Sequence, residues 1–178
     1  MINTIHVDSI PAKYIAIDTI TYCVNMDTTI NKVAYLWNSN SIKSVFGDLT
    51  KVINHYDNQD DDVYFVNIKK DSYLRLILFG ESIDANNIGS CEVGYTKYLS
   101  SNIKLNQSSF TSFFTETNIK LGTVFDTIIH IKGNKYTKVN DKHFFTIKYN
   151  CPMETYIGEY TFNNNGELIR FKYGFINP

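Results

Sequence analysis

The stretch Tyr73-Leu-Arg-Leu-Ile-Leu-Phe79 decides the expected fold, because its pattern recurs in Tyr156-Ile-Gly-Glu-Tyr-Thr-Phe162. After a turn, each of these two stretches is followed by another, and the two following stretches also match each other. Ile88-Gly-Ser-Cys-Glu-Val-Gly-Tyr95 follows the first, and Leu168-Ile-Arg-Phe-Lys-Tyr-Gly-Phe175 follows the other. Both pairs are rich in β-branched and aromatic residues, so all four stretches are expected to be strands.

A third match lies upstream, between Met26–Val33 and Leu121–Ile128. Three matches in the same order predict one supersecondary unit that is used twice. We therefore expect an α+β protein with two tandem repeats, each a helix plus an antiparallel meander. The meanders are expected to join in one continuous antiparallel sheet with the helices on one face. The expected boundaries are a first repeat with an N-terminal arm over 1–98, a polar link over 99–112 and a second repeat over 113–178.

The first repeat is expected to begin with a strand or a strand pair over 14–25 and a helix from Asp27 to Trp37. Asp27 can cap this helix, and apolar residues follow it at helical spacing, namely Ile30, Val33, Ala34 and Trp37. A second, short helix is expected over 42–53. Three strands are expected next, over 63–68, 73–79 and 88–95.

The second repeat is expected to begin with an extended segment over 113–121. A helix over 124–131 should follow and end at Gly133. Three strands are then expected, over 142–149, 156–162 and 168–175. The last two are joined by Asn163-Asn-Asn-Gly166, a strong turn signal because Asn and Gly tolerate positive φ.

Composition places the chain among globular proteins, with 43% hydrophobic and 20% charged residues. The 15% share of aromatic residues favours strands and supplies side chains of the kind enriched at protein interfaces. The formal net charge is −1 and the basic residues are scattered, which gives no electrostatic case for nucleic acid. No apolar run approaches the roughly 18 residues of a membrane-spanning helix. We therefore expect neither a nucleic-acid partner nor a membrane span.

The three cysteines, Cys23, Cys91 and Cys151, form no Cys-x-x-Cys pair, which argues against a zinc ribbon or a thioredoxin motif. Their odd number favours a reducing compartment with buried thiols, and one disulfide plus a spare thiol is the alternative. The first residues lack the basic and apolar regions of a signal peptide. We expect a cytoplasmic protein. If a signal segment has been removed, the protein is instead periplasmic or anchored at the outer membrane.

The second half of the chain contains three features that occur together, namely Lys120–Ile128, Gly133 and Tyr160–Ile169. With these features it resembles the repeat of β-lactamase inhibitor proteins and of the related small outer-membrane assembly lipoproteins. In that superfamily a Gly-Met-Thr/Ser helix start precedes a Gly-containing turn and a Phe-x-x-Gly-x-Leu hairpin. Residues 113–175 match this pattern, whereas the first half matches it loosely, with Asp27 where the Gly would stand. The resemblance implies a tandem α+β fold and a protein-binding role, without identifying β-lactamase as the target.

Residues suited to catalysis or metal binding give weak signals. The acidic loop His55–Asp62 lacks the Gly and the terminal Glu of an EF-hand and is expected to be solvated. Cys91 and Cys151 could act with His130 or His143, but neither cysteine stands at a helix start that would activate it. No Gly-x-Ser-x-Gly elbow and no phosphate-binding Gly-rich loop is present. We therefore expect no catalytic residue, no metal and no cofactor.

The exposed face of the expected sheet is a better candidate for a site. Alternation along 168–175 places Arg170 and Lys172 on the side opposite the aromatic residues of that strand. One side must face the core, and the other is free to bind; arginine is a typical interface anchor. We predict a partner-binding face that contains Arg170 and Lys172, with Glu92 and Arg75 as further candidates.

Together these features predict a non-enzymatic module that binds a protein. The leading hypothesis is an inhibitor or a bacterial immunity protein that occludes a toxin or an enzyme through the exposed sheet face. The first alternative is an exported or lipid-anchored envelope protein of the assembly-lipoprotein type. The second is a small hydrolase with a dispersed site, which requires a pocket where His, Cys and carboxylates converge.

Overall fold

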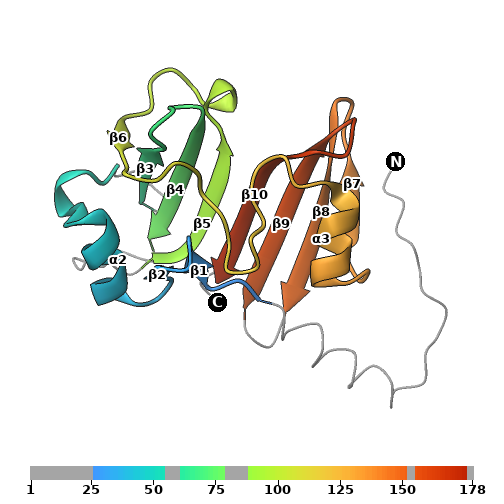
Figure 1. Ribbon diagram of the computed structural model, residues 1–178, viewed down its shortest axis with the longest axis horizontal. Coiled ribbons are helices and arrows are strands. Elements are labelled where there is room, and N and C mark those ends of the chain that lie inside the picture. The colour runs from blue at the N-terminus through green and yellow to red at the C-terminus, as the bar shows by residue number, and fades with distance from the viewer. Residues whose placement is uncertain (1–25, 55–60, 79–87, 152–154, 176–178) are drawn as a thin grey trace, which may run out of the picture.

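The computed structural model describes residues 26–54, 61–78, 88–151 and 155–175. These residues contain two α-helices and ten strands, which confirms the expected α+β class. Eight strands form one sheet in the order β6-β3-β4-β5-β10-β9-β8-β7 (Figure 1). The strand expected over 14–25 lies outside the described residues.

Both halves of the chain contribute to the large sheet. The first half supplies β3 Asp62–Val66, β4 Ser72–Leu78 and β5 Ile88–Tyr95, with β6 Leu105–Gln107 at one edge. The second half supplies β7 Thr137–Asn140, β8 Phe144–Cys151, β9 Tyr156–Asn163 and β10 Leu168–Phe175. The two halves meet where β5 pairs with β10 in antiparallel orientation.

The structure does not support a fully antiparallel sheet. The short edge strand β6 pairs with β3 in parallel, whereas the other neighbouring strands are antiparallel. β6 lies inside the segment expected to be only a polar link. The 3-10 helix η2 Thr96–Tyr98 precedes this link, and together they carry the chain across from β5 to the outer side of β3. A crossover of that kind allows parallel pairing.

The expected tandem repeat is not supported either, because different elements accompany the strands of each half. In the first half they are β1 Thr29–Ile30, β2 Ala34–Tyr35, α2 Ser39–Phe46 and the 3-10 helix η1 Leu49–Lys51. In the second half they are the helix α3 Phe125–Lys132 and the edge strand β7.

The helix expected from Asp27 to Trp37 is wrong, because this segment forms the β1-β2 hairpin. Asn31 and Lys32 have left-handed φ angles of 53° and 61° and reverse the chain between the two strands. The apolar residues at helical spacing also fit a hairpin that buries alternate side chains. Periodicity over so short a window could not separate the two structures.

The remaining helix predictions are closer to the structure. The helix expected over 42–53 is divided at Gly47, whose φ of 80° ends α2 and whose N–H donates to the carbonyl of Lys43. Asn38 caps the start of α2 by accepting a hydrogen bond from the N–H of Ser41. The helix α3 begins one residue later than expected and ends at Gly133, which has a φ of 91°.

One hydrophobic cluster lies between the helices and one face of the large sheet. Ile42 of α2 and Ile128 of α3 belong to it, together with wholly buried aromatic residues of the strands, including Tyr160, Phe162, Phe171 and Tyr173. Because both helices contribute to the same cluster, they cover the same sheet face (Figure 1). Neither has the length and apolar character needed to cross a membrane, and the described residues contain no other α-helix.

Candidate functional site

A row of alternating charges crosses the open face, which is the face of the large sheet opposite α2 and α3. The strand register places five side chains next to one another in the order Arg75, Glu92, Lys172, Glu159 and Lys148. We call these five residues the charged row. Directly opposite residues of antiparallel strands lie about 4.5 to 5.5 Å apart at Cα, so neighbouring charges of opposite sign alternate across five strands.

Both ends of the charged row contain ion pairs within the protein. Arg75 Nε lies 2.6 Å from Asp62 Oδ2, and Lys148 Nζ lies 2.8 Å from Glu159 Oε1. Asp62 is wholly buried and also accepts a hydrogen bond from Asn54 Nδ2 at 3.0 Å. The prediction that Asp62 belongs to a solvated acidic loop is therefore wrong, while residues 55–60 of that loop lie outside the described residues.

Near the centre of the open face, Glu92 is held by a tyrosine. The hydroxyl of Tyr73 donates to Glu92 Oε1 at 2.5 Å. Burial, and then the negative charge of Glu92, raise the pKa of Tyr73 well above its usual value, so the phenol remains a donor. The ring of Tyr73 covers Gly94, where an added Cβ would approach the ring to 2.7 Å. A glycine is thus needed at this position for the tyrosine to reach Glu92.

Arg170 and Lys172 lie on β10, the strand next to the junction between the two halves. Arg170 is exposed and Lys172 is half-buried. Within the part of the chain that the structure describes, neither side chain takes part in an ion pair or a hydrogen bond. The open face therefore has paired charges at its ends and two unpaired cations on one central strand.

The structure brings the four predicted site residues together on the open face. Arg75, Glu92 and Lys172 belong to the charged row, and Arg170 lies two residues from Lys172 on the same side of β10. Sequence reasoning missed Glu159 and Lys148. Their alternation with the apolar residues of β9 and β8 was visible, but their place beside Lys172 depends on the register between strands.

A second charged cluster lies on the covered side of the sheet. Lys132 Nζ is 2.6 Å from Asp27 Oδ2, and the two side chains are only 4% and 0% exposed. Thr117 Oγ1 donates to Asp27 Oδ1 at 2.9 Å, and the Tyr160 hydroxyl donates to Oδ2 at 3.4 Å. The backbone N–H of Asp27 donates to the hydroxyl of Tyr156 at 2.9 Å. We call these residues the Asp27 cluster.

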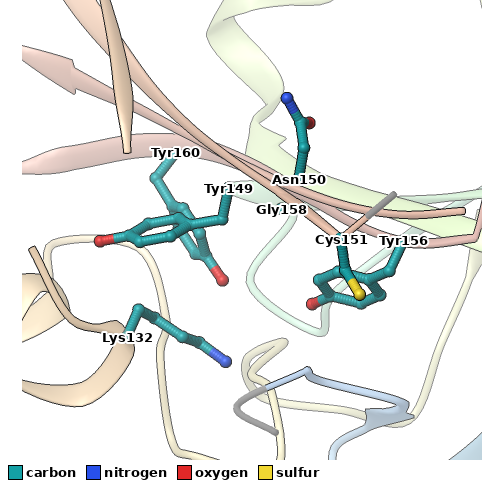
Figure 2. A pocket seen from close by; sticks show the side chains of 7 residues that line it. All are labelled: Lys132, Tyr149, Asn150, Cys151, Tyr156, Gly158 and Tyr160. Atoms are coloured by element: carbon teal, nitrogen blue, oxygen red, sulfur yellow. The ribbon is translucent and has the colours of Figure 1, made fainter. Parts of the chain in front are cut away.

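A small cavity adjoins the Asp27 cluster, and its volume of about 10 Å³ is close to the space that one water molecule needs. Figure 2 shows Lys132 below the sheet on the same side as Tyr156 and Tyr160, while Asn150 points to the opposite side. Burial and the neighbouring ionisable groups raise the pKa of both tyrosines, so both stay protonated. The cluster fixes the segment at Asp27 against α3 and the sheet.

The two cysteines that the structure describes, Cys91 and Cys151, are both buried. Cys91 has a free thiol that is wholly buried in β5, as predicted, and burial raises its pKa. Cys151 is buried at the end of β8 and is disulfide-bonded, which agrees with the alternative of one disulfide plus a spare thiol. Throughout the four described ranges, no three His, Cys, Asp or Glu residues gather closely enough to hold a metal ion.

The β1-β2 hairpin presents a smaller apolar surface that sequence reasoning missed. Val33, Tyr35 and Trp37 are each about half exposed, at 49%, 52% and 47%. Trp37 has a left-handed φ of 63°, which is rare for a bulky residue, and its ring contacts Phe175 edge-on at 6.1 Å. The expectation of a helix here concealed this alternation of buried and exposed residues.

Comparison of the chain with protein-family models, with curated proteins and with solved structures finds no match.

Proposed function

We propose that the protein is a non-enzymatic module that binds another protein through the open face. The observation that carries this proposal is the pair of unpaired cations, Arg170 and Lys172, on a central strand of that face. Other charges nearby have partners within the chain, such as Arg75 with Asp62. Charged groups that remain available on a rigid surface favour recognition of a complementary partner.

The mode of action that this surface supports is occlusion. The charged row is fixed across five hydrogen-bonded strands, so a partner can dock without first ordering a flexible loop. An inhibitor or immunity protein needs only such a surface, because it blocks the active site of an enzyme or toxin and performs no reaction of its own. Electrostatic complementarity would then govern the rate and the selectivity of binding.

The test is capture of a partner with matched charge variants. The tagged protein is incubated with an extract of its own organism, beside Arg170→Glu/Lys172→Glu and the control Lys104→Glu/Lys142→Glu. Both control lysines are exposed, lie off the open face and give the same change of net charge. We expect one stoichiometric partner with the wild type and the control, and its loss with the open-face variant. Retention by both variants, or no partner at low ionic strength, would contradict the proposal.

A second candidate function is an exported or lipid-anchored envelope protein. The disulfide at Cys151 favours it, because disulfides persist in oxidising compartments. Fractionation of the native organism, with alkylation of free thiols before and after reduction, tests this candidate. A protein found in the envelope with Cys151 oxidised supports export, and a cytoplasmic protein with three alkylated cysteines excludes it.

A further inference from the structure

The distribution of charge on the open face contains information about the partner. Arg75 is paired with Asp62, Lys148 is paired with Glu159, and Glu92 accepts the hydrogen bond of a tyrosine. The Tyr73 phenol is neutral, so Glu92 keeps its negative charge beside Lys172. Within the described residues, Arg170 and Lys172 are the cations of this face that have no ion-pair or hydrogen-bond partner, and both lie on β10.

We infer that the partner presents a narrow acidic strip, in which two carboxylates spaced like alternate residues of an extended segment dock on Arg170 and Lys172. This inference rests on the proposed function, because it describes what the open face binds.

The spacing of the two cations supports this geometry. Arg170 and Lys172 are two residues apart on one strand, so their Cα atoms lie about 6.6 to 6.8 Å apart on the same face. Alternate acidic residues of an extended partner segment have the same spacing as Arg170 and Lys172, and their side chains likewise point to one side of the segment. Arg170 can hold one carboxylate with two parallel hydrogen bonds, and Lys172 can attract the second as a compact charge.

The neighbours of Lys172 limit the width of the strip. Glu92 and Glu159 lie beside it on β5 and β9, about 5 Å away on either side at Cα. A broad anionic surface, such as the phosphates of a nucleic acid, would place negative charge against these carboxylates. A protein segment with acidic residues in the middle and basic or neutral residues at its sides complements all three positions.

The binding test uses three blocked peptides with the same length: alternating Glu and Thr, alternating Gln and Thr, and alternating Lys and Thr. Binding to the ¹⁵N-labelled protein is followed by NMR titration at low ionic strength. We expect the Glu peptide to bind roughly tenfold or more tightly than the Gln peptide, because its hydrogen bonds are charge-assisted. Its amide shifts should concentrate on β10, β5 and β9, and raising the ionic strength to about 0.15 M should weaken binding.

The variant Arg170→Gln/Lys172→Gln should lose the preference for the Glu peptide, whereas Lys104→Gln/Lys142→Gln should keep it. Equal binding of the Glu and Gln peptides, or a preference that survives in the open-face variant, overturns the acidic strip. Tighter binding of single-stranded oligothymidylate than of the Glu peptide also overturns it. If a protein partner is nevertheless captured through the open face, the proposed function stands and only the acidic strip fails.

Discussion

Two lysine–carboxylate pairs of this protein have similar lengths and opposite surroundings. The Lys132–Asp27 pair measures 2.6 Å, with side chains 4% and 0% exposed. The Lys148–Glu159 pair measures 2.8 Å, with side chains 39% and 33% exposed. The first lies on the covered side of the sheet, where Tyr160 and Thr117 also donate hydrogen bonds to the Asp27 carboxylate. The second lies on the open face, where water competes for both partners.

The comparison shows that burial, and not the distance between the charged atoms, determines how much stability is lost when one partner of an ion pair is removed. A buried pair contributes little relative to a well-packed apolar pair, but removing one partner is costly because a charge is left without compensation. An exposed pair is screened and contributes little in either case. The Asp27 cluster therefore fixes the fold, and the charged row remains available for binding.

The largest effect is expected for Lys132→Met. The substitution leaves the Asp27 carboxylate buried without its cation, and this should lower the free energy of unfolding by about 3 to 5 kcal/mol. Urea denaturation of the variant and the wild type measures the loss. A loss below about 1 kcal/mol would show that the pair is not buried as described.

The double variant Asp27→Asn/Lys132→Met provides the matching control. It removes both charges and keeps the approximate volume of both side chains. It should be clearly more stable than Lys132→Met alone, because the penalty of the single variant comes from the uncompensated charge. Equal stability of the single and double variants would attribute the loss to packing instead.

An intermediate effect is expected at alkaline pH from the tyrosines of the Asp27 cluster. Burial raises the pKa of Tyr156 and Tyr160 in the folded protein above the unfolded value near 10. Below about pH 10 both states hold the protons, whereas above it only the unfolded state releases them, so stability falls as the pH rises. Each such tyrosine contributes a loss of up to about 1.4 kcal/mol per pH unit.

Tyr160→Phe tests this dependence. The phenylalanine cannot ionise in either state, so the decline in stability between about pH 10 and about pH 11 should become less steep than in the wild type. At neutral pH the variant should lose only about 1 kcal/mol, because the hydrogen bond it removes is long, at 3.4 Å. If the free energy of unfolding of the variant declined with pH as steeply as that of the wild type across this range, the burial assigned to Tyr160 would be contradicted.

The sequence predicted the strands of the sheet well and the segments around them poorly. The strands β5, β9 and β10 were predicted almost to the residue, because aromatic and β-branched residues alternate along them. The β1-β2 hairpin was missed because a short apolar segment fits both the helical period of 3.6 residues and the strand period of two. The parallel strand β6 was missed because its three residues lie in a polar stretch, and the pairing with β3 that makes them a strand depends on the tertiary fold.

At the two charged sites, the open face and the Asp27 cluster, local sequence patterns were likewise informative and long-range contacts could not be predicted. Alternation alone placed Arg170 and Lys172 on the open face, since that inference needs only the local period of two. The Asp27 cluster could not be predicted, because Asp27 and Tyr156 are 129 positions apart and their contact depends on the complete fold. A buried lysine such as Lys132 has no local signal that separates it from an exposed one.

The smallest effect is expected for Lys148→Met, which makes the same substitution as Lys132→Met on the open face. The free energy of unfolding should change by no more than about 1 kcal/mol, because both partners of the pair are already partly solvated. Urea denaturation at low and at high ionic strength measures the change, and added salt should reduce it further. The variant also frees Glu159 beside Lys172, so binding of the acidic peptide should weaken even though stability is kept. A loss as large as that of Lys132→Met would mean that the open face is buried by another part of the chain, and it would remove the distinction between the two pairs.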